Sequence, residues 1–187
     1  MTAELLSVDL AKSYRLLNHG PTVLVSSAHQ GARNVMAAAW AMPLDFDPPK
    51  VLVVIDKSTF SRGLIEASGE FILNIPCKAQ AAAVLRAGSA SGKDGDKFAA
   101  SGLAPARAEK VGAPRVAGCI AYLECKVIDE PRNQQRYDLF IGEVVAAAAD
   151  RRVFDGHWHF DDDALRSLHY VAGGAFFATG EAFEVKL

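Results

Sequence analysis

Residues 34–66, NVMAAAWAMPLDFDPPKVLVVIDKSTFSRGLIE, hold the pattern that decides the fold of this chain. The first seven residues predict a strand with small side chains, in which three successive alanines leave the backbone nearly bare. A loop with paired prolines follows, and the unbroken apolar run VLVVI at residues 51–55 predicts a fully buried strand. A helical pattern begins directly after this run, so we expect a strand-to-helix turn at residues 56–59.

This turn combines hydroxyl groups with cations. The first turn of a helix leaves backbone N–H groups unpaired, and the helix dipole favours negative charge there. Serine and threonine hydroxyls add donors, and lysine or arginine adds charge. The pattern predicts a phosphate site, although a well-capped surface helix with Ser58 or Thr59 at its N-cap would use the same residues. The candidate residues are Asp56, Lys57, Ser58, Thr59, Ser61 and Arg62.

The small-residue strand is the second candidate site. Alanines beside a tryptophan would let a flat ring lie against main-chain N–H and C=O groups. A tightly packed core strand is the alternative reading, and a helix over residues 35–41 is the rival element, because alanine is a poor strand former. Together with the turn, the strand predicts a cofactor with a planar ring at one end and a phosphate at the other. The candidate ring-binding residues are Asn34, Val35, Met36, Ala37, Ala38, Ala39 and Trp40.

Strands dominate the rest of the chain. We predict strands at residues 22–27, 34–41, 51–55, 70–75, 119–128 and 137–149, and helices at 11–17, 59–67 and 79–87, with Gly69 ending the second helix. We expect turns at residues 30–31 and 130–133, a loop at 42–50, a strand or loop at 153–160, and a helical turn at 161–168. Several strands joined by hairpins, with few short helices, indicate a mainly β fold: a β-barrel with helical additions, as one domain over residues 1–187.

Residues 88–118 differ in composition from their surroundings. They are rich in Gly, Ala, Ser, Lys and Pro, and residues 94–100 alone suggest one or two helical turns. A loop of this length in a compact domain is usually a functional cover or a disordered segment. Phe98 and Leu103 can anchor the segment, so we expect a cover that packs against the domain.

Composition excludes some classes of partner. The 187 residues carry a net charge of -2, so no overall basic field favours nucleic acid or an anionic membrane. No segment approaches the roughly 18 apolar residues of a membrane helix, and the N-terminus lacks a signal pattern, so we expect a cytoplasmic protein. Three scattered cysteines without CxxC spacing suggest buried free thiols.

Histidines supply the remaining candidates. His157 and His159 lie on one face of an extended segment before three aspartates, a set that can bind a transition metal but is more typical of an exposed hairpin. His169 precedes a Gly-Gly pair and two phenylalanines, where its imidazole could donate a proton or steady an anion, or simply be structural. The sequence contains no GxGxxG, Walker or nucleophile-elbow pattern.

Taken in order, these motifs resemble the flavin reductase-like, FMN-binding split-barrel family, which includes flavoredoxins and reductase components of two-part monooxygenases. The likeness extends from about residue 14 to residue 180. The matching segments are TVLVS (22–26), NVMAAAW (34–40), DPPKVLVVI (47–55), KSTFSRGLI (57–65), GEFILNIP (69–76), DKFAASGL (96–103), AYLEC (121–125) and LHYVAGG (168–174).

The resemblance implies a Greek-key-like split barrel that binds FMN. It places the flavin ring along residues 34–40 and the phosphate at the positions from Lys57 to Arg62. It also implies a homodimer with flavin near the interface, residues 96–98 lining that cleft, and His169 near the ring or the nicotinamide. Many relatives have Ser or Thr where this chain has Ala39, so one side-chain contact to the flavin is missing here.

We therefore expect hydride transfer from NAD(P)H to FMN, followed by electron transfer to an acceptor or a partner oxygenase. The first alternative is a flavoredoxin-type FMN electron carrier without its own NAD(P)H activity. The second is a flavin-free β-barrel binding module.

Overall fold

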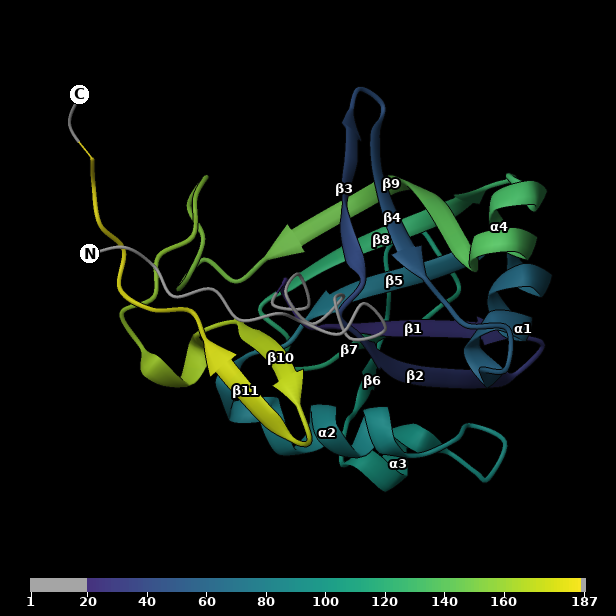
Figure 1. Cartoon of the computed structure of the whole chain (residues 1–187), viewed down its shortest axis with the longest axis horizontal. Coiled ribbons are helices and arrows are strands. Elements are labelled where there is room, and N and C mark those ends of the chain that lie inside the picture. The colour runs from purple at the N-terminus through teal and green to yellow at the C-terminus, as the bar shows by residue number, and fades with distance from the viewer. Residues whose placement is uncertain (1–19, 186–187) are drawn as a thin grey trace, which may run out of the picture.

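A curved antiparallel sheet forms the centre of the computed structural model, which describes residues 20–185 of the chain (Figure 1). Within these residues seven strands form this sheet in the order β2-β1-β5-β8-β9-β4-β3. The order is non-sequential, as expected for a Greek-key-like fold. The strands are β1 (Val23–His29), β2 (Ala32–Ala38), β3 (Ala41–Phe46), β4 (Pro49–Val54), β5 (Glu70–Ile75), β8 (Ala121–Ile128) and β9 (Leu139–Ala149).

The two edge strands show that the sheet is rolled into a split barrel. β2 and β3 lie at opposite edges of the sheet, yet only Ala39 and Trp40 separate them in the chain. Such a short link requires the two edges to come close together, so the sheet must curl on itself. The prediction of a mainly β split barrel is confirmed, and the rival helix over residues 35–41 is wrong.

Strand alternation divides the apolar residues between two cores. Val23 and Val25 of β1 face the first core, inside the barrel, with Phe71 and Phe140. Leu24 faces the second core, which lies on the outer side of the sheet. The interior is tightly packed, because a Cβ placed on Gly142 of β9 would lie 2.5 Å from the ring of Phe71.

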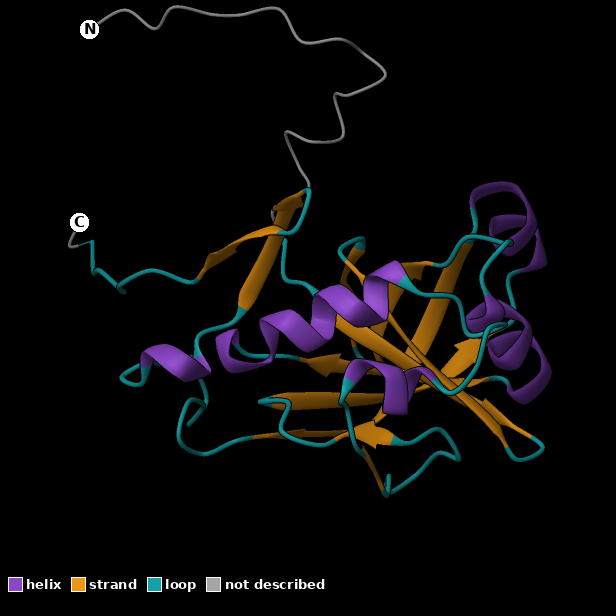
Figure 2. Cartoon of the chain, turned by 90° about the horizontal axis from the view of Figure 1, so that it is seen from below, coloured by secondary structure: helices purple, strands orange, loops and turns teal. Residues whose placement is uncertain are grey.

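Helices cover the outer side of β1 and β2. α2 (Ala81–Ser89) and α3 (Lys97–Ser101) pack there over the second core, and Figure 2 shows this helical layer from its own side. α1 (Phe60–Ser68) and α4 (Pro131–Tyr137) lie together at one end of the barrel (Figure 1). As predicted, α1 ends at Gly69, whose φ of 70° is left-handed and whose N–H donates to Ile65 O at 2.8 Å.

The smaller elements lie outside the barrel. Two hairpins are formed by β6 (Pro105–Ala106) with β7 (Arg115–Val116), and by β10 (Leu168–Ala172) with β11 (Ala175–Ala178). Short 3-10 turns occur at η2 (Lys78–Gln80) and η3 (Asp163–Leu165), the latter within the predicted helical turn. None of the helices in the described part of the chain is long and apolar enough to cross a membrane.

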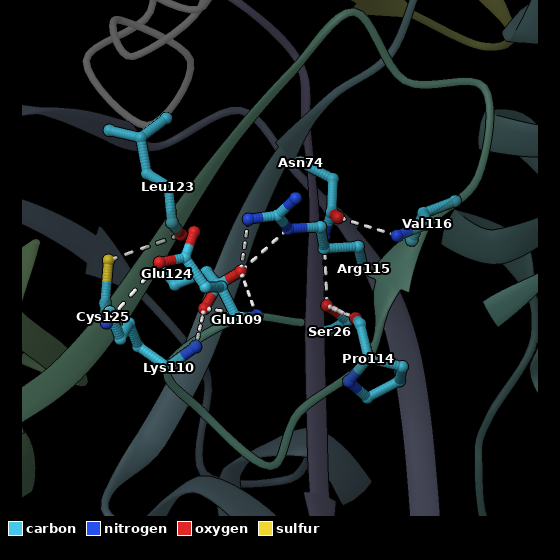
Figure 3. A network of polar contacts seen from close by, with 10 residues as sticks. All are labelled: Ser26, Asn74, Glu109, Lys110, Pro114, Arg115, Val116, Leu123, Glu124 and Cys125. Atoms are coloured by element: carbon cyan, nitrogen blue, oxygen red, sulfur yellow. Dashed lines mark hydrogen bonds and ion pairs between the residues drawn. The ribbon is translucent and has the colours of Figure 1, made fainter. Parts of the chain in front are cut away.

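The segment at residues 88–118 packs as a cover, as expected. Its anchors Phe98 and Leu103 are buried in the second core. Figure 3 shows how its last part is fastened to the outer face of the sheet: the carboxylate of Glu124 accepts the Lys110 N–H at 2.6 Å and pairs with Arg115. Burial opposes the charge of Glu124, but these partners hold its pKa below the ordinary value.

A second set of bonds beside Glu124 completes this attachment. Asn74 of β5 accepts the Val116 N–H at 2.8 Å, and the Ser26 hydroxyl donates to Pro114 O at 2.6 Å (Figure 3). These buried polar side chains hold residues 105–118 on the face of the sheet, although the only regular structure in this segment is the short β6–β7 pair.

Two predictions of loop structure are wrong. Residues 42–50 form most of the β3–β4 hairpin, because an edge strand tolerates Pro43 and the first residue of a strand tolerates Pro49. The turn predicted at residues 130–133 is the start of α4, with Pro131 in its first turn. Residues 153–160 contain only the isolated bridge between Phe154 and Trp158, and the helix predicted at residues 11–17 lies outside the described residues.

Candidate functional site

A cavity of about 530 Å³ lies where the end of β2, helix α2, the β10–β11 hairpin and the α4–β9 corner meet. This volume is within the range of about 300–1,000 Å³ that is typical of small-molecule sites. Both predicted site segments reach it. Residues 36–40 form one wall, and Asp56, the first residue of the strand-to-helix turn, contributes to another.

The end of β2 and the residue after it, with Ala37, Ala38 and Ala39, form the wall of the cavity with the smallest side chains, and we call this segment the alanine strand. β2 is an edge strand, so part of its backbone N–H and C=O groups lack a strand partner. Ala38 packs towards the barrel core and Ala37 towards α2, and neither side chain extends far from the main chain. A flat ligand can therefore approach the backbone here.

The first two residues of the predicted ring site do not line this cavity. Asn34 is 2% exposed, and its amide donates to the Ser61 hydroxyl at 2.8 Å, which ties β2 to α1. Val35 is buried in the second core. Met36, Ala37, Ala38, Ala39 and Trp40 are the part of the predicted segment that the fold brings to the cavity.

Helix α2 forms the opposite wall, which the sequence reasoning missed. Val84, Leu85, Gly88 and Ser89 line the cavity. A Cβ placed on Gly88 would lie 3.4 Å from the Cβ of Ala37, so the helix and the alanine strand approach each other closely. The available signal was the run of small residues in this helix, which allows such an approach.

An aromatic pair from the β10–β11 hairpin closes a third side. Tyr170 and Phe176 are cross-strand partners, with ring centroids 5.4 Å apart in an edge-to-face arrangement, and both line the cavity. The Thr22 hydroxyl accepts the Tyr170 N–H at 2.9 Å, which fixes the hairpin to the start of β1. The signal for this hairpin was the Gly173-Gly174 pair between two aromatic segments.

His169 precedes Tyr170 in β10 and pairs with Phe177. Because side chains alternate along a strand, His169 lies on the opposite face of the hairpin from Tyr170 and does not line the described cavity. Its catalytic role remains a prediction.

Two carboxylates and a tyrosine line the cavity beside the alanine strand. Asp138 follows α4 in a left-handed conformation with φ of 55°, next to Tyr137. Asp56 accepts the Ser58 N–H at 2.7 Å, and hydrogen bonds from Ser58 lower the pKa of Asp56. The Val54 N–H donates to Trp40 O at 3.0 Å, which joins β4, just before this turn, directly to the link after β2.

The tip of α1 retains the donors that an anion requires. Thr59 is the N-cap residue, but its hydroxyl donates to Asp56 O at 2.8 Å and, in the described structure, does not cap the helix. Lys57 and Ser58 are exposed. The N–H groups at the start of α1 are thus left without a side-chain cap, next to a cation.

Ser61 and Arg62 lie inside the fold rather than at this tip. Ser61 is fully buried against Asn34. Arg62 is 6% exposed, and its guanidinium contacts Glu66 and Asp138. Burial opposes the charge of Arg62, but these two carboxylates raise its pKa.

The remaining sequence candidates do not contribute to the cavity. His157 and His159 have ring centroids 6.4 Å apart, and residues 20–185 contain no group of three or more side chains that could hold a metal ion. Asp96 caps α3 and pairs with Arg33 at 2.9 Å, so residues 96–98 do not line this cavity. The three cysteines are buried free thiols, as predicted, and burial raises the pKa of Cys125 to about 12.

Solved structures with this architecture include an FMN-binding one. The chain superimposes with a TM-score of 0.87 on an FMN-binding domain of a flavin reductases-like enzyme from Shewanella baltica OS155, with 52% sequence identity and 97% of each chain covered. It also resembles flavoredoxin of Desulfovibrio vulgaris (Miyazaki F), with a TM-score of 0.80, 28% identity, and coverage of 99% of this chain and 97% of that one.

Two curated relatives are also similar to this chain. An uncharacterized protein of Escherichia coli K12, YddH, is 46% identical over 178 residues, 93% of this chain and 94% of its own. The reductase subunit HsaB of a flavin-dependent monooxygenase from Mycobacterium tuberculosis is 32% identical over 104 residues, 56% of this chain and 52% of its own. The model of the flavin reductase like domain matches residues 15–169. The chain therefore belongs to the flavin reductase-like domain family.

Proposed function

We propose that this protein binds FMN in the cavity between β2 and α2 and reduces it with NAD(P)H. The observation that carries the proposal is the meeting of three features at one cavity: the bare edge of the alanine strand, the aromatic pair of the β10–β11 hairpin, and the turn that leads to the uncapped tip of α1. These features match the ring and the phosphate of one flavin mononucleotide. Bound FMN would supply a hydride acceptor and an onward electron donor.

The residues present fit FMN along its length. Backbone groups of residues 36–40 would hold the polar edge of the ring, with Tyr170 and Phe176 as apolar walls. Asp56 and Asp138 offer hydrogen-bond acceptors for ribityl hydroxyls. The first N–H groups of α1, with Lys57, Ser58 and Thr59, would hold the phosphate. Because Ala39 has no side-chain donor, the ring would depend on backbone contacts at that position.

The chain's own residues shape the access of the nicotinamide donor. Without a dinucleotide-binding motif, NAD(P)H would bind briefly in the open part of the cavity, in contact with the bound flavin. Val84 and Leu85 would exclude water from this wall and orient the two rings. His169 lies on the outer face of the hairpin, and we propose that it holds or donates a proton where the nicotinamide donor enters from that side.

We further propose a homodimer and an external electron acceptor. Met42, Leu44 and Phe46 on the projecting edge strand β3 are 55%, 45% and 97% exposed, and an apolar sheet edge of this kind is typical of an interaction surface (Figure 1). The likeness to a monooxygenase reductase subunit supports a partner oxygenase as acceptor. The three free thiols suit a reducing compartment, which supports a cytoplasmic location.

A flavoredoxin-type electron carrier is the second candidate, supported by the 28% identity to flavoredoxin over almost the whole chain. The two functions separate in one anaerobic experiment, in which FMN-loaded protein is mixed with NADH and, separately, with NADPH. Loss of the visible absorbance of oxidised flavin supports the reductase. Bound flavin that stays oxidised with both donors supports the carrier, and protein that binds no FMN supports a flavin-free binding module.

A further inference from the structure

We infer that Arg62 is a positioning residue that fixes the cavity wall at the α4–β9 corner, and that it does not bind the flavin phosphate. The inference rests on the proposed function, and it changes the role that the family likeness assigns to this position. Arg62 is the third residue of α1, in its first turn, but its side chain points into the fold and only 6% of the residue is exposed.

The guanidinium of Arg62 is almost fully used by protein acceptors. Nε donates to Glu66 at 2.8 Å, and Nη2 donates to Gln134 O at 2.7 Å. Nη1 donates both to Asp138 and to Ile55 O, the latter at 3.2 Å. A guanidinium has five N–H donors, so these contacts occupy four of them.

The charge around Arg62 also opposes a phosphate contact. Glu66 and Asp138 both pair with Arg62, so two carboxylates already balance one cation. A phosphate dianion would be repelled by these carboxylates or would have to displace one of them, and the largely buried Asp138 would then lose its ion-pair partner, which is costly. Lys57, by contrast, is exposed beside the tip, and the carboxylate nearest to it along the chain, Asp56, is exposed as well, so a phosphate can reach Lys57 without displacing a buried group.

What Arg62 does instead is join three separate segments. Its bonds reach the end of β4 through Ile55 O, helix α4 through Gln134 O, and the corner through Asp138. The Ile55 N–H donates to Asp138 O at 2.8 Å, so the corner is held from two sides. The left-handed φ of 55° at Asp138 is uncommon for a residue with a side chain, and these bonds stabilise it.

This corner is part of the cavity. Tyr137 and Asp138 line it beside the alanine strand, and both would move if the corner relaxed. The guanidinium also lies 5.2 Å from the centre of the Phe140 ring, a fully buried residue of the barrel core, which anchors the arrangement to β9. Loss of Arg62 should therefore disturb the part of the site that faces the ring and ribityl chain rather than the phosphate.

FMN and riboflavin distinguish the two roles, because riboflavin lacks the phosphate. The variants are Arg62→Lys, which keeps the charge but has only three N–H donors, all on one nitrogen, for the four acceptors, and Lys57→Ala as the matched phosphate-site control. Dissociation constants for both flavins follow from quenching of flavin fluorescence. Arg62→Lys should weaken FMN and riboflavin by the same factor, about ten-fold, and change the visible absorption band of bound riboflavin. Lys57→Ala should weaken FMN alone.

A second variant guards against misfolding. Glu66→Gln neutralises one of the two carboxylates that hold Arg62 without changing the cavity lining, so it should weaken both flavins by equal factors, whereas an Arg62 that bound phosphate would be freed and FMN alone would bind more tightly. Weaker FMN binding with unchanged riboflavin binding in Arg62→Lys would overturn the inference and leave the proposed function intact, as would unchanged binding of both flavins. Wild-type protein that binds neither flavin would overturn the proposed function and this inference with it.

Discussion

A leucine in place of Gly88 would test whether the flavin ring lies between α2 and the alanine strand. Gly88 lines the cavity, and a Cβ at this position lies 3.4 Å from the Cβ of Ala37, an ordinary contact that needs no rearrangement. The larger leucine side chain would extend beyond this Cβ. In a helix it points back towards the preceding turn, where Val84 and Leu85 also line the cavity.

The magnitude follows from the tight packing of α2. Val84 and Ala87 hold the helix in the second core with 1% and 0% exposure, so α2 has little freedom to move away. Overpacking of a filled site costs about 1–3 kcal/mol. If the ring occupies this space, that cost is paid on binding, and the affinity for FMN should fall roughly 5- to 150-fold.

The assay is a fluorescence titration of FMN against wild type, Gly88→Leu and Gly88→Ala. The alanine variant is the matched control, since its single added carbon makes only the contact to Ala37, and its affinity should stay within about two-fold of wild type. Thermal melts establish that each variant is folded. A folded Gly88→Leu protein with wild-type affinity for FMN would refute the placement of the ring at this wall.

Three further predictions test other parts of the account. Lys57→Ala should weaken FMN binding by about 0.5–1 kcal/mol, because the lysine is exposed, and in a titration at low and high salt the loss should shrink as the exposed charge is screened. Glu124→Gln should lower the free energy of unfolding by about 2–3 kcal/mol in urea denaturation. This loss is smaller than that expected for breaking a fully buried ion pair, because the Arg115 side chain is 20% exposed. Because the folded state lowers the pKa of Glu124, this stabilisation is present above its unfolded pKa and is lost as pH falls through its folded pKa. The unfolding free energies of wild type and Glu124→Gln should therefore become equal in acid. A difference that persists in acid would contradict the ion pair as its source. If β3 forms the proposed dimer interface, Phe46→Ser, at a residue 97% exposed, should give a folded monomer in light scattering, and a variant that remains a dimer would place the interface elsewhere.

Local sequence patterns were sufficient for most of the barrel. The run VLVVI, the Gly69 stop and the long strand before Ala149 each carry their own signal, and the structure contains all three elements. The prediction that VLVVI is fully buried is wrong, because Leu52 and Val54 point away from the barrel core and are only half-buried. The β3 strand carried no such signal, because three prolines and two aspartates make residues 42–50 resemble a loop. Only the position of β3 at the sheet edge makes these residues compatible with a strand.

The site was predictable only where one segment supplies it. The alanine strand and the strand-to-helix turn were found because each combines a backbone feature with suitable side chains within a few residues. The walls formed by Gly88, Tyr137, Tyr170 and Phe176 come from distant segments that meet only through the fold. Arg62 is a residue that the sequence included and the structure removes from the phosphate site. Its charge suggested contact with a ligand, but its burial beside two carboxylates is visible only in three dimensions.

Titration of the wild-type protein with FMN, with riboflavin as the comparison, tests the central claim most directly. If the cavity holds the ring and the tip of α1 holds the phosphate, both flavins should bind, and FMN should bind more tightly by about ten-fold because of its charge-assisted hydrogen bonds. Equal affinity for the two flavins would contradict the phosphate site, and failure of both to bind would contradict the assignment of the cavity to a flavin.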